Sequence, residues 1–174
     1  HALDDVVRAK SPPRLPVVLT REEIRAVLAH LDRVPRLVAT LLHGSGLRLL
    51  EGLRLRIRDV DFGRGEIIVR SGKGGHDRRT VLPAGSRDTL ARQLEAVRRL
   101  HTWDLARGAG WVELPGALAR KYPNAGREWP WQWMFPATRP YTHRETGQIR
   151  RHHLHETVVQ RTVSHTGCHR EKAW

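Results

Sequence analysis

The sequence predicts a single α+β domain that is mainly helical and carries a small antiparallel sheet. Several segments place apolar residues at helical spacing, which indicates amphipathic helices. Two short runs, 66–70 and 78–82, flank a glycine-rich turn, as the strands of a hairpin do. A chain of 174 residues fits one domain and can bury a core of ordinary size.

The chain begins with a segment that we interpret as an interdomain linker, residues 1–19. Its prolines enforce an extended path, because proline and the residue before it disfavour helix. Thr20 and Glu23 then have the spacing of a capping box, which predicts the start of a helix. The domain is therefore expected to occupy residues 20–174.

The remaining elements follow from periodicity and from turn residues. Further helices are expected at 35–44, at 46–55 with Ser45 as its cap, from Ser86 onward, at 114–120 and at 154–163. A second hairpin is expected within 142–153, around Thr146 and Gly147. The sequence shows no internal repeat.

The net charge of the chain indicates what kind of molecule it binds. The net charge is +13 and the isoelectric point is near 11.4, which indicates a polyanion, above all nucleic acid. The single cysteine, Cys168, excludes a disulfide framework within the chain. The sequence contains no apolar run of transmembrane length and no signal peptide, so we expect no membrane partner and a cytoplasmic location.

Three residues in the first half could act on a phosphodiester. Arg48 lies near the start of a predicted helix and could clamp phosphate, and Glu51, three residues later, could orient its guanidinium. Lys73 lies in the glycine turn and could supply a proton, since the charge of lysine can be given up. The alternatives are an exposed salt bridge for Arg48 and an ordinary turn residue for Lys73.

The two stretches around these residues resemble the arginine and lysine boxes of the tyrosine recombinases. They are GSGLRLLEGLRLRIRDVDF, which starts at Gly44, and IIVRSGKGGHDRRTVLP, which ends at Pro83. The resemblance implies that Arg48 is the first catalytic arginine and that Lys73 is the hairpin lysine that protonates the leaving group. It also implies a supporting role for Glu51 and a reaction without a cofactor. His76 departs from the family pattern, which often has lysine there.

The second half is similar, more narrowly, to the integron integrases. The similarity is carried by LPGAL at 114–118, KYP at 121–123, EWPWQWMFP at 128–136 and RRHHL at 150–154. These enzymes carry an insertion, here about residues 108–140, that grips bases bulging from folded single-stranded attC hairpins.

The resemblance implies a set of DNA-contacting residues in this half. Trp131 matches the tryptophan that stacks on a bulged base, and His152 and His153 would face it across a pocket. Stacking of this kind contributes roughly 1–3 kcal/mol per base. Arg151 and Trp129 complete the predicted set.

Simpler interpretations remain for these residues. Trp129 and Trp133 could cap a small core, and the three alternating tryptophans would share a face only in an extended strand. The histidines at 152, 153 and 155, with Cys168 and His169, lack the ligand spacing of zinc sites, so we expect no metal site.

The family's H-x-L-R box and nucleophilic tyrosine have no match in residues 164–174. The chain has two tyrosines. Tyr122 lies in the insertion motif and Tyr141 follows a proline in a loop, so neither fits the role of nucleophile. We therefore expect a partial catalytic domain, incomplete at its C-terminus, that binds DNA without cleaving it alone. In the full-length parent, the resemblance implies cutting and rejoining of attC and attI DNA through a phosphotyrosine, within a synaptic complex of several protomers. The alternative is a non-catalytic basic DNA- or RNA-binding module or remnant.

Overall fold

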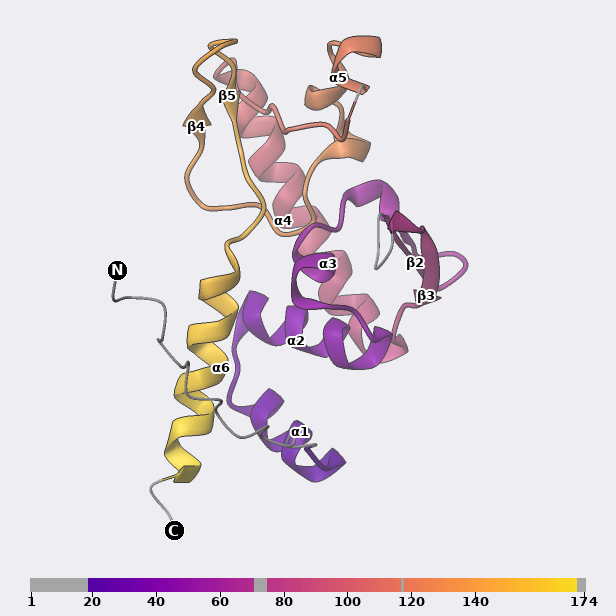
Figure 1. Ribbon diagram of the computed structural model, residues 1–174, viewed down its shortest axis with the longest axis vertical. Helices are drawn as coiled ribbons and strands as arrows, with labels where there is room; N and C mark the ends of the chain where they lie inside the picture. Colours follow the sequence, from indigo (N-terminus) through magenta and orange to yellow (C-terminus); the bar gives the residue numbers. More distant parts are fainter. Residues whose placement is uncertain (1–18, 71–74, 117, 172–174) are drawn as a thin grey trace, which may run out of the picture.

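The computed structural model describes residues 19–70, 75–116 and 118–171 (Figure 1). Its helices are α1 (Arg21–Ala29), α2 (Arg33–Ser45), α3 (Leu49–Leu53), α4 (Arg87–Ala106), α5 (Leu118–Lys121) and α6 (Glu156–Glu171). Its strands are β1 (Val60–Asp61), β2 (Glu66–Val69), β3 (Arg78–Val81), β4 (Tyr141–Thr142) and β5 (Ile149–Arg150). The mainly helical α+β prediction is confirmed.

The strands form two antiparallel sheets, one with the order β1-β2-β3 and one with β4-β5. The predicted hairpin at 66–82 is confirmed, with Glu66 opposite Val81 and Val69 opposite Arg78. The sequence did not predict β1, which has only two residues. The second predicted hairpin is also present, with Tyr141 opposite Arg150, and Figure 1 shows it beside the C-terminal half of α4.

The start of α1 follows the sequence prediction. The Glu23 amide donates to the Thr20 hydroxyl at 3.2 Å, and the Thr20 amide donates to the Glu23 carboxylate at 2.9 Å. These bonds satisfy two amides that a helix start otherwise leaves unpaired. The predicted linker, apart from Leu19, lies outside the described residues.

The boundary between α2 and α3 differs from the prediction. Helix α2 runs through Gly44 and ends at Ser45, because Gly46 takes the left-handed conformation, with a φ of +62°, and its amide donates to the Leu42 carbonyl. The residue before α3 is then Arg48, so the prediction that Ser45 caps this helix is wrong. Arg48 consequently stands at the exposed entrance of the helix.

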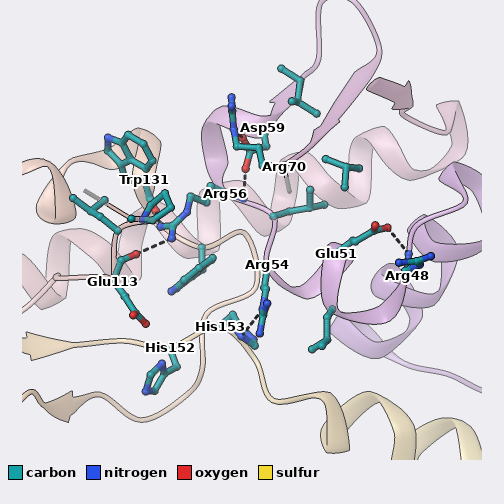
Figure 2. Close-up of a pocket in the computed structure, with 18 residues that line it drawn as sticks. Arg48, Glu51, Arg54, Arg56, Asp59, Arg70, Glu113, Trp131, His152 and His153 are labelled. Atoms are coloured by element: carbon teal, nitrogen blue, oxygen red, sulfur yellow. Dashed lines mark hydrogen bonds and ion pairs between the residues drawn. The ribbon is translucent and has the colours of Figure 1, made fainter. Parts of the chain in front are cut away.

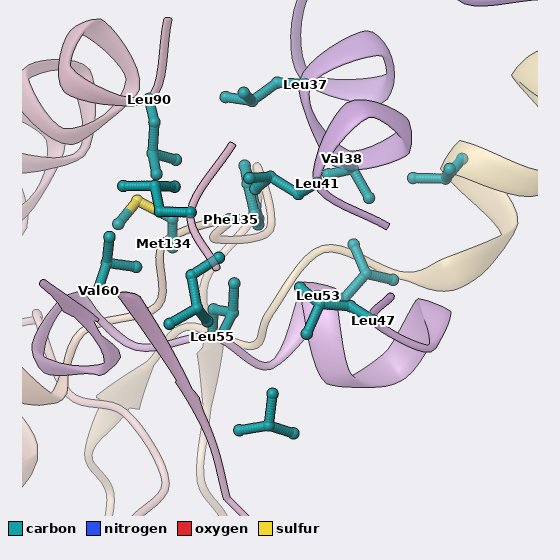
Figure 3. Packing of buried hydrophobic residues seen from close by; sticks show 14 residues of the cluster. Leu37, Val38, Leu41, Leu47, Leu53, Leu55, Val60, Leu90, Met134 and Phe135 are labelled. Atoms are coloured by element: carbon teal, nitrogen blue, oxygen red, sulfur yellow. The ribbon is translucent and has the colours of Figure 1, made fainter. Parts of the chain in front are cut away.

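The main core joins α2, α3, the three-stranded sheet, α4 and α6 around Met134 and Phe135, which are fully buried (Figure 3). Helix α6 packs against α1, α2 and α3. A second, smaller apolar cluster lies within the insertion and contains Val112, Leu114, Ala125, Trp131 and Trp133. The insertion thus has a core of its own next to the main one.

A buried glutamine holds the insertion together. The side-chain amide nitrogen of Gln132 lies 3.1–3.2 Å from the carbonyl oxygens of Gly110, Gly126 and Glu128. Gly126 and Glu128 lie in and directly after one 3₁₀ turn, and Gly110 lies sixteen residues before Gly126, so one donor group links two separate parts of the insertion. A buried acceptor left without a donor costs free energy, so the identity of this side chain matters.

We predict that Gln132→Glu lowers the free energy of unfolding by about 1–3 kcal/mol or more, because it replaces the donor with an acceptor among three carbonyls. Urea denaturation measures the change. Gln160→Glu, at an exposed position of α6, is the control and should change stability by less than about 0.5 kcal/mol. Equal effects of the two substitutions would contradict this account of Gln132.

Candidate nucleic-acid interface

A cavity of about 660 Å³ opens between α3, the end of β2 and the insertion (Figure 2). Among the residues that line it are Arg48, Glu51, Arg54, Arg56, Asp59, Arg70, Glu113, Trp131, Trp133, His152 and His153. The structure therefore brings Arg48 and Glu51 into the same cavity as three predicted DNA-contacting residues, Trp131, His152 and His153. We call it the arginine–tryptophan pocket.

Arg48 lies at one end of the pocket. Its backbone amide donates to the Glu51 carboxylate at 2.8 Å, which fixes the start of α3. Its guanidinium is exposed and makes no hydrogen bond to any residue that the structure describes. This cation is therefore available to an anionic ligand.

Glu51 does not orient Arg48 as expected. Its carboxylate instead accepts two hydrogen bonds from the Arg78 guanidinium, at 2.8 and 2.7 Å, so it ties α3 to β3. The bonds from Arg78 lower the pKa of Glu51 to about 2, and the same pairing raises the pKa of Arg78. This pair locks the hairpin onto the helix that begins after Arg48.

Lys73 lies outside the described residues, so its predicted role stays a prediction. The pocket residue nearest to it in the sequence is Arg70, which follows β2. The Arg70 Nε donates to Asp59 at 2.7 Å. The Arg56 amide donates to the same carboxylate at 3.0 Å, so the end of β2 reaches the pocket beside Arg56.

The two tryptophans at the other end are covered by arginines. Trp131 and Trp133 are only 9% and 8% exposed. The Arg58 guanidinium lies 3.9 Å from the centre of the Trp131 ring, and the Arg56 guanidinium lies 3.8 Å from that of Trp133. Arg56 lines the pocket, whereas Arg58 does not, so Arg58 supports the Trp131 ring without itself facing the cavity.

Arg56 is a pocket residue that the sequence did not single out. Its guanidinium donates to the Trp131 carbonyl at 2.6 Å and to the Glu113 carbonyl at 2.7 Å. Burial lowers the pKa of Arg56 to about 10, which still leaves it charged at neutral pH. These two partners are 75 and 57 residues from Arg56 in the sequence, so no local sequence pattern predicts the contacts.

The two predicted histidines both line the pocket. His152 is exposed and stacks on Tyr141, with ring centres 4.1 Å apart and planes 5° apart. His153 meets Trp133 edge-on at 5.5 Å, and its Nδ1 donates to the Leu154 carbonyl at 2.9 Å. Burial lowers the pKa of His153, which favours its neutral form.

Two members of the predicted DNA-contacting set lie elsewhere. Trp129 does not line the pocket and packs on α4, 4.2 Å from the Arg98 guanidinium and 5.8 Å from the His101 ring. Residues 129–131 form a 3₁₀ turn, so the tryptophans do not share the face of an extended strand. The interpretation of Trp129 as a residue that caps packed structure fits this placement.

Arg151 is 5% exposed and lies away from solvent. Its guanidinium makes two bonds to Asp104, at 2.9 and 2.7 Å, and two more to the carbonyls of Ala137 and Thr138. Its donors are occupied inside the protein, which does not favour the prediction that Arg151 contacts DNA. Arg151 instead anchors the segment between the insertion and α6 to α4.

The tyrosines lie apart from Arg48. Tyr122 is exposed beside α5, and Tyr141 stacks on His152 at the base of the second hairpin. Neither lines the pocket. In the described part of the chain, no group of three or more histidine, cysteine or acidic residues is arranged to hold a metal ion, and no helix there is long and apolar enough to cross a membrane.

Comparison with known proteins identifies the family. The sequence matches the model of the phage integrase family over residues 17–168, so the chain belongs to that family, the tyrosine site-specific recombinases. It is 45% identical over 159 residues to an integrase/recombinase of Escherichia coli, a match that covers 91% of this chain and 47% of the relative. An integrase/recombinase of Pseudomonas aeruginosa matches with the same identity and coverage.

A solved structure gives a partial match. The crystal structure of XerA recombinase aligns with a TM-score of 0.43 and 31% identity, over 49% of this chain and 32% of that one. The chain spans about half the length of the two integrase/recombinase relatives.

The Glu51–Arg78 pair gives a pH-dependent prediction. Because its pKa is lower in the folded protein than the ordinary value of 4.5, Glu51 stabilises the fold above about pH 4.5, and this stabilisation is lost as pH falls toward 2. Glu51→Gln should cost about 1–2 kcal/mol at pH 7, since Arg78 stays partly open to solvent.

Urea denaturation at a series of pH values measures this difference, which should shrink below pH 4.5. Glu66→Gln, which breaks an exposed pair with Arg79 at 3.4 Å, is the control and should cost less than about 1 kcal/mol. A difference between wild type and Glu51→Gln that stays constant from pH 7 to pH 3 would refute the assignment.

The Arg151–Asp104 pair gives a prediction on stability. Asp104→Asn leaves a buried guanidinium without its counter-charge and should cost about 3–5 kcal/mol in the free energy of unfolding. The double substitution Asp104→Leu with Arg151→Met should cost less, because it removes both charges together. If Arg151→Met keeps full stability and loses DNA affinity, the original DNA-contact prediction is right after all.

Proposed function

We propose that this chain is the DNA-binding part of the catalytic domain of an integron integrase. The proposal rests on the resemblance of residues 114–136 and 150–154 to those enzymes, within a chain of the tyrosine recombinase family. Its DNA partners are folded single-stranded attC hairpins and attI duplex, in the bacterial cytoplasm.

The observation that carries the proposal is the joint lining of one pocket by Arg48 and by Trp131, His152 and His153. An exposed guanidinium suits a phosphodiester, and an indole with two imidazoles suits an unpaired base. The cavity, about 660 Å³, lies within the usual range for small-ligand sites. One nucleotide that leaves its helix can therefore present its phosphate and its base to opposite ends of the same pocket.

Catalysis belongs to the full-length parent in this proposal. There Arg48 stabilises charge on the pentavalent phosphate, Lys73 protonates the leaving 5′-oxygen, and a tyrosine forms the covalent link to DNA. No cofactor is needed, and other protomers join in a synaptic complex. Tyr122 and Tyr141 do not line the pocket, so the activity we propose for these 174 residues is DNA binding.

The test compares binding to a folded hairpin with bulged bases and to the same stem fully paired, over a salt series. Affinity for both falls with salt because phosphate contacts release counterions. We expect tighter binding to the bulged form, and Trp131→Ala should reduce that preference by about five- to one-hundred-fold, as the loss of 1–3 kcal/mol of stacking implies.

Trp103→Ala is the matched control, because Trp103 is 49% exposed on α4 and does not line the pocket. It should leave the preference unchanged. Trp131→Phe, which keeps an aromatic ring, separates loss of stacking from loss of folding. Equal binding of the wild type to the bulged and paired forms would favour a basic DNA- or RNA-binding module instead.

A further inference from the structure

Arg54 lies in the middle of the arginine–tryptophan pocket, between Arg48 and the aromatic end (Figure 2). It is the residue that follows α3, and its backbone amide is held by the Leu50 carbonyl at 3.0 Å. Its position is therefore fixed by the same short helix that Arg48 opens. Its side chain is exposed to the cavity.

His153 orients the Arg54 side chain. The His153 Nδ1 donates to the Leu154 carbonyl, so its Nε2 is the acceptor that faces the Arg54 Nε at 3.5 Å. This long bond uses only one of the five N–H donors of the guanidinium. The other four make no hydrogen bond to any residue that the structure describes, and they remain for a ligand.

The acidic residues around the pocket leave Arg54 unneutralised. Glu51 is paired with Arg78 at 2.7 Å, and Asp59 is paired with Arg70 at 2.7 Å. Glu113, which Figure 2 shows on the side of the pocket opposite Arg48, forms no ion pair with Arg54. The cavity therefore presents Arg48 and Arg54 as two cations without carboxylate partners among the described residues.

We propose that Arg54, oriented by His153, binds the phosphodiester next to a nucleotide that has left its helix. The proposal rests on the proposed function and names the residue that holds the backbone at that site. A guanidinium with four open donors can bind a phosphate through two parallel hydrogen bonds. Trp131 then receives the base, while Arg48 holds a second phosphate along the strand.

The experiment combines a protein substitution with a change in the DNA. Arg54→Gln removes the charge of the side chain, and a methylphosphonate beside the bulged nucleotide removes the charge of that phosphate. Arg92→Gln is the matched control, since Arg92 is exposed on α4 outside the pocket and the variant has the same net charge. Thermal melts verify that both variants keep the fold.

We expect Arg54→Gln to weaken binding to the bulged hairpin about tenfold and to reduce the salt slope by about one, more than Arg92→Gln does. The methylphosphonate should weaken wild-type binding by a similar factor and leave the Arg54→Gln variant almost unaffected. Such non-additivity is the signature of a direct contact between the two groups.

The other outcomes are distinct. If the wild type prefers the bulged hairpin but Arg54→Gln behaves like Arg92→Gln, or if the two changes add fully, the role of Arg54 is overturned and the proposed function stands. If the wild type does not prefer the bulged hairpin, the proposed function fails and the role of Arg54 fails with it.

Discussion

The pocket depends on one buried guanidinium, that of Arg56. It is 7% exposed, donates to two carbonyls of the insertion and covers Trp133. Burial of a charge is costly, and here hydrogen bonds and an indole face offset that cost. The adjoining backbone pairs in the same place, with Ile57 bonded to the Gln132 carbonyl and Met134 to that of Leu55. The insertion is therefore fixed next to the segment that follows α3, the helix that Arg48 precedes and Arg54 follows.

This constraint explains why phosphate-binding and base-binding groups occupy one cavity although they lie far apart in the chain. Arg56 follows α3, the helix that begins after Arg48, and its guanidinium donates to the Trp131 carbonyl, so this one residue connects the two ends of the pocket. The Arg58 guanidinium covers the Trp131 ring without lining the pocket, so it helps to hold the indole in place.

The sequence predicted the features that depend on near neighbours. The capping box at Thr20 and the hairpin at 66–82 were predicted because their partners are a few residues apart. The burial of Arg151 was not predicted because its partner, Asp104, is 47 residues away, and nothing local separates a buried arginine from an exposed one. The predicted end of α2 at Gly44 was wrong for a related reason. Gly44 and Gly46 could both end the helix, and the sequence does not show that Gly46 is the one that takes the left-handed conformation.

In a chain so rich in arginine, charge alone does not identify the site. The structure divides the arginines by their partners. The Arg56 guanidinium donates to backbone carbonyls, and the Arg151 guanidinium donates to the buried Asp104 carboxylate. The Arg78 guanidinium donates to the Glu51 carboxylate. Arg48 and Arg54 keep guanidinium donors open to the cavity, because Arg78 binds Glu51 and Arg70 binds Asp59. These two ion pairs thus contribute to the site indirectly, by leaving two cations without a carboxylate partner where an anionic strand can reach them.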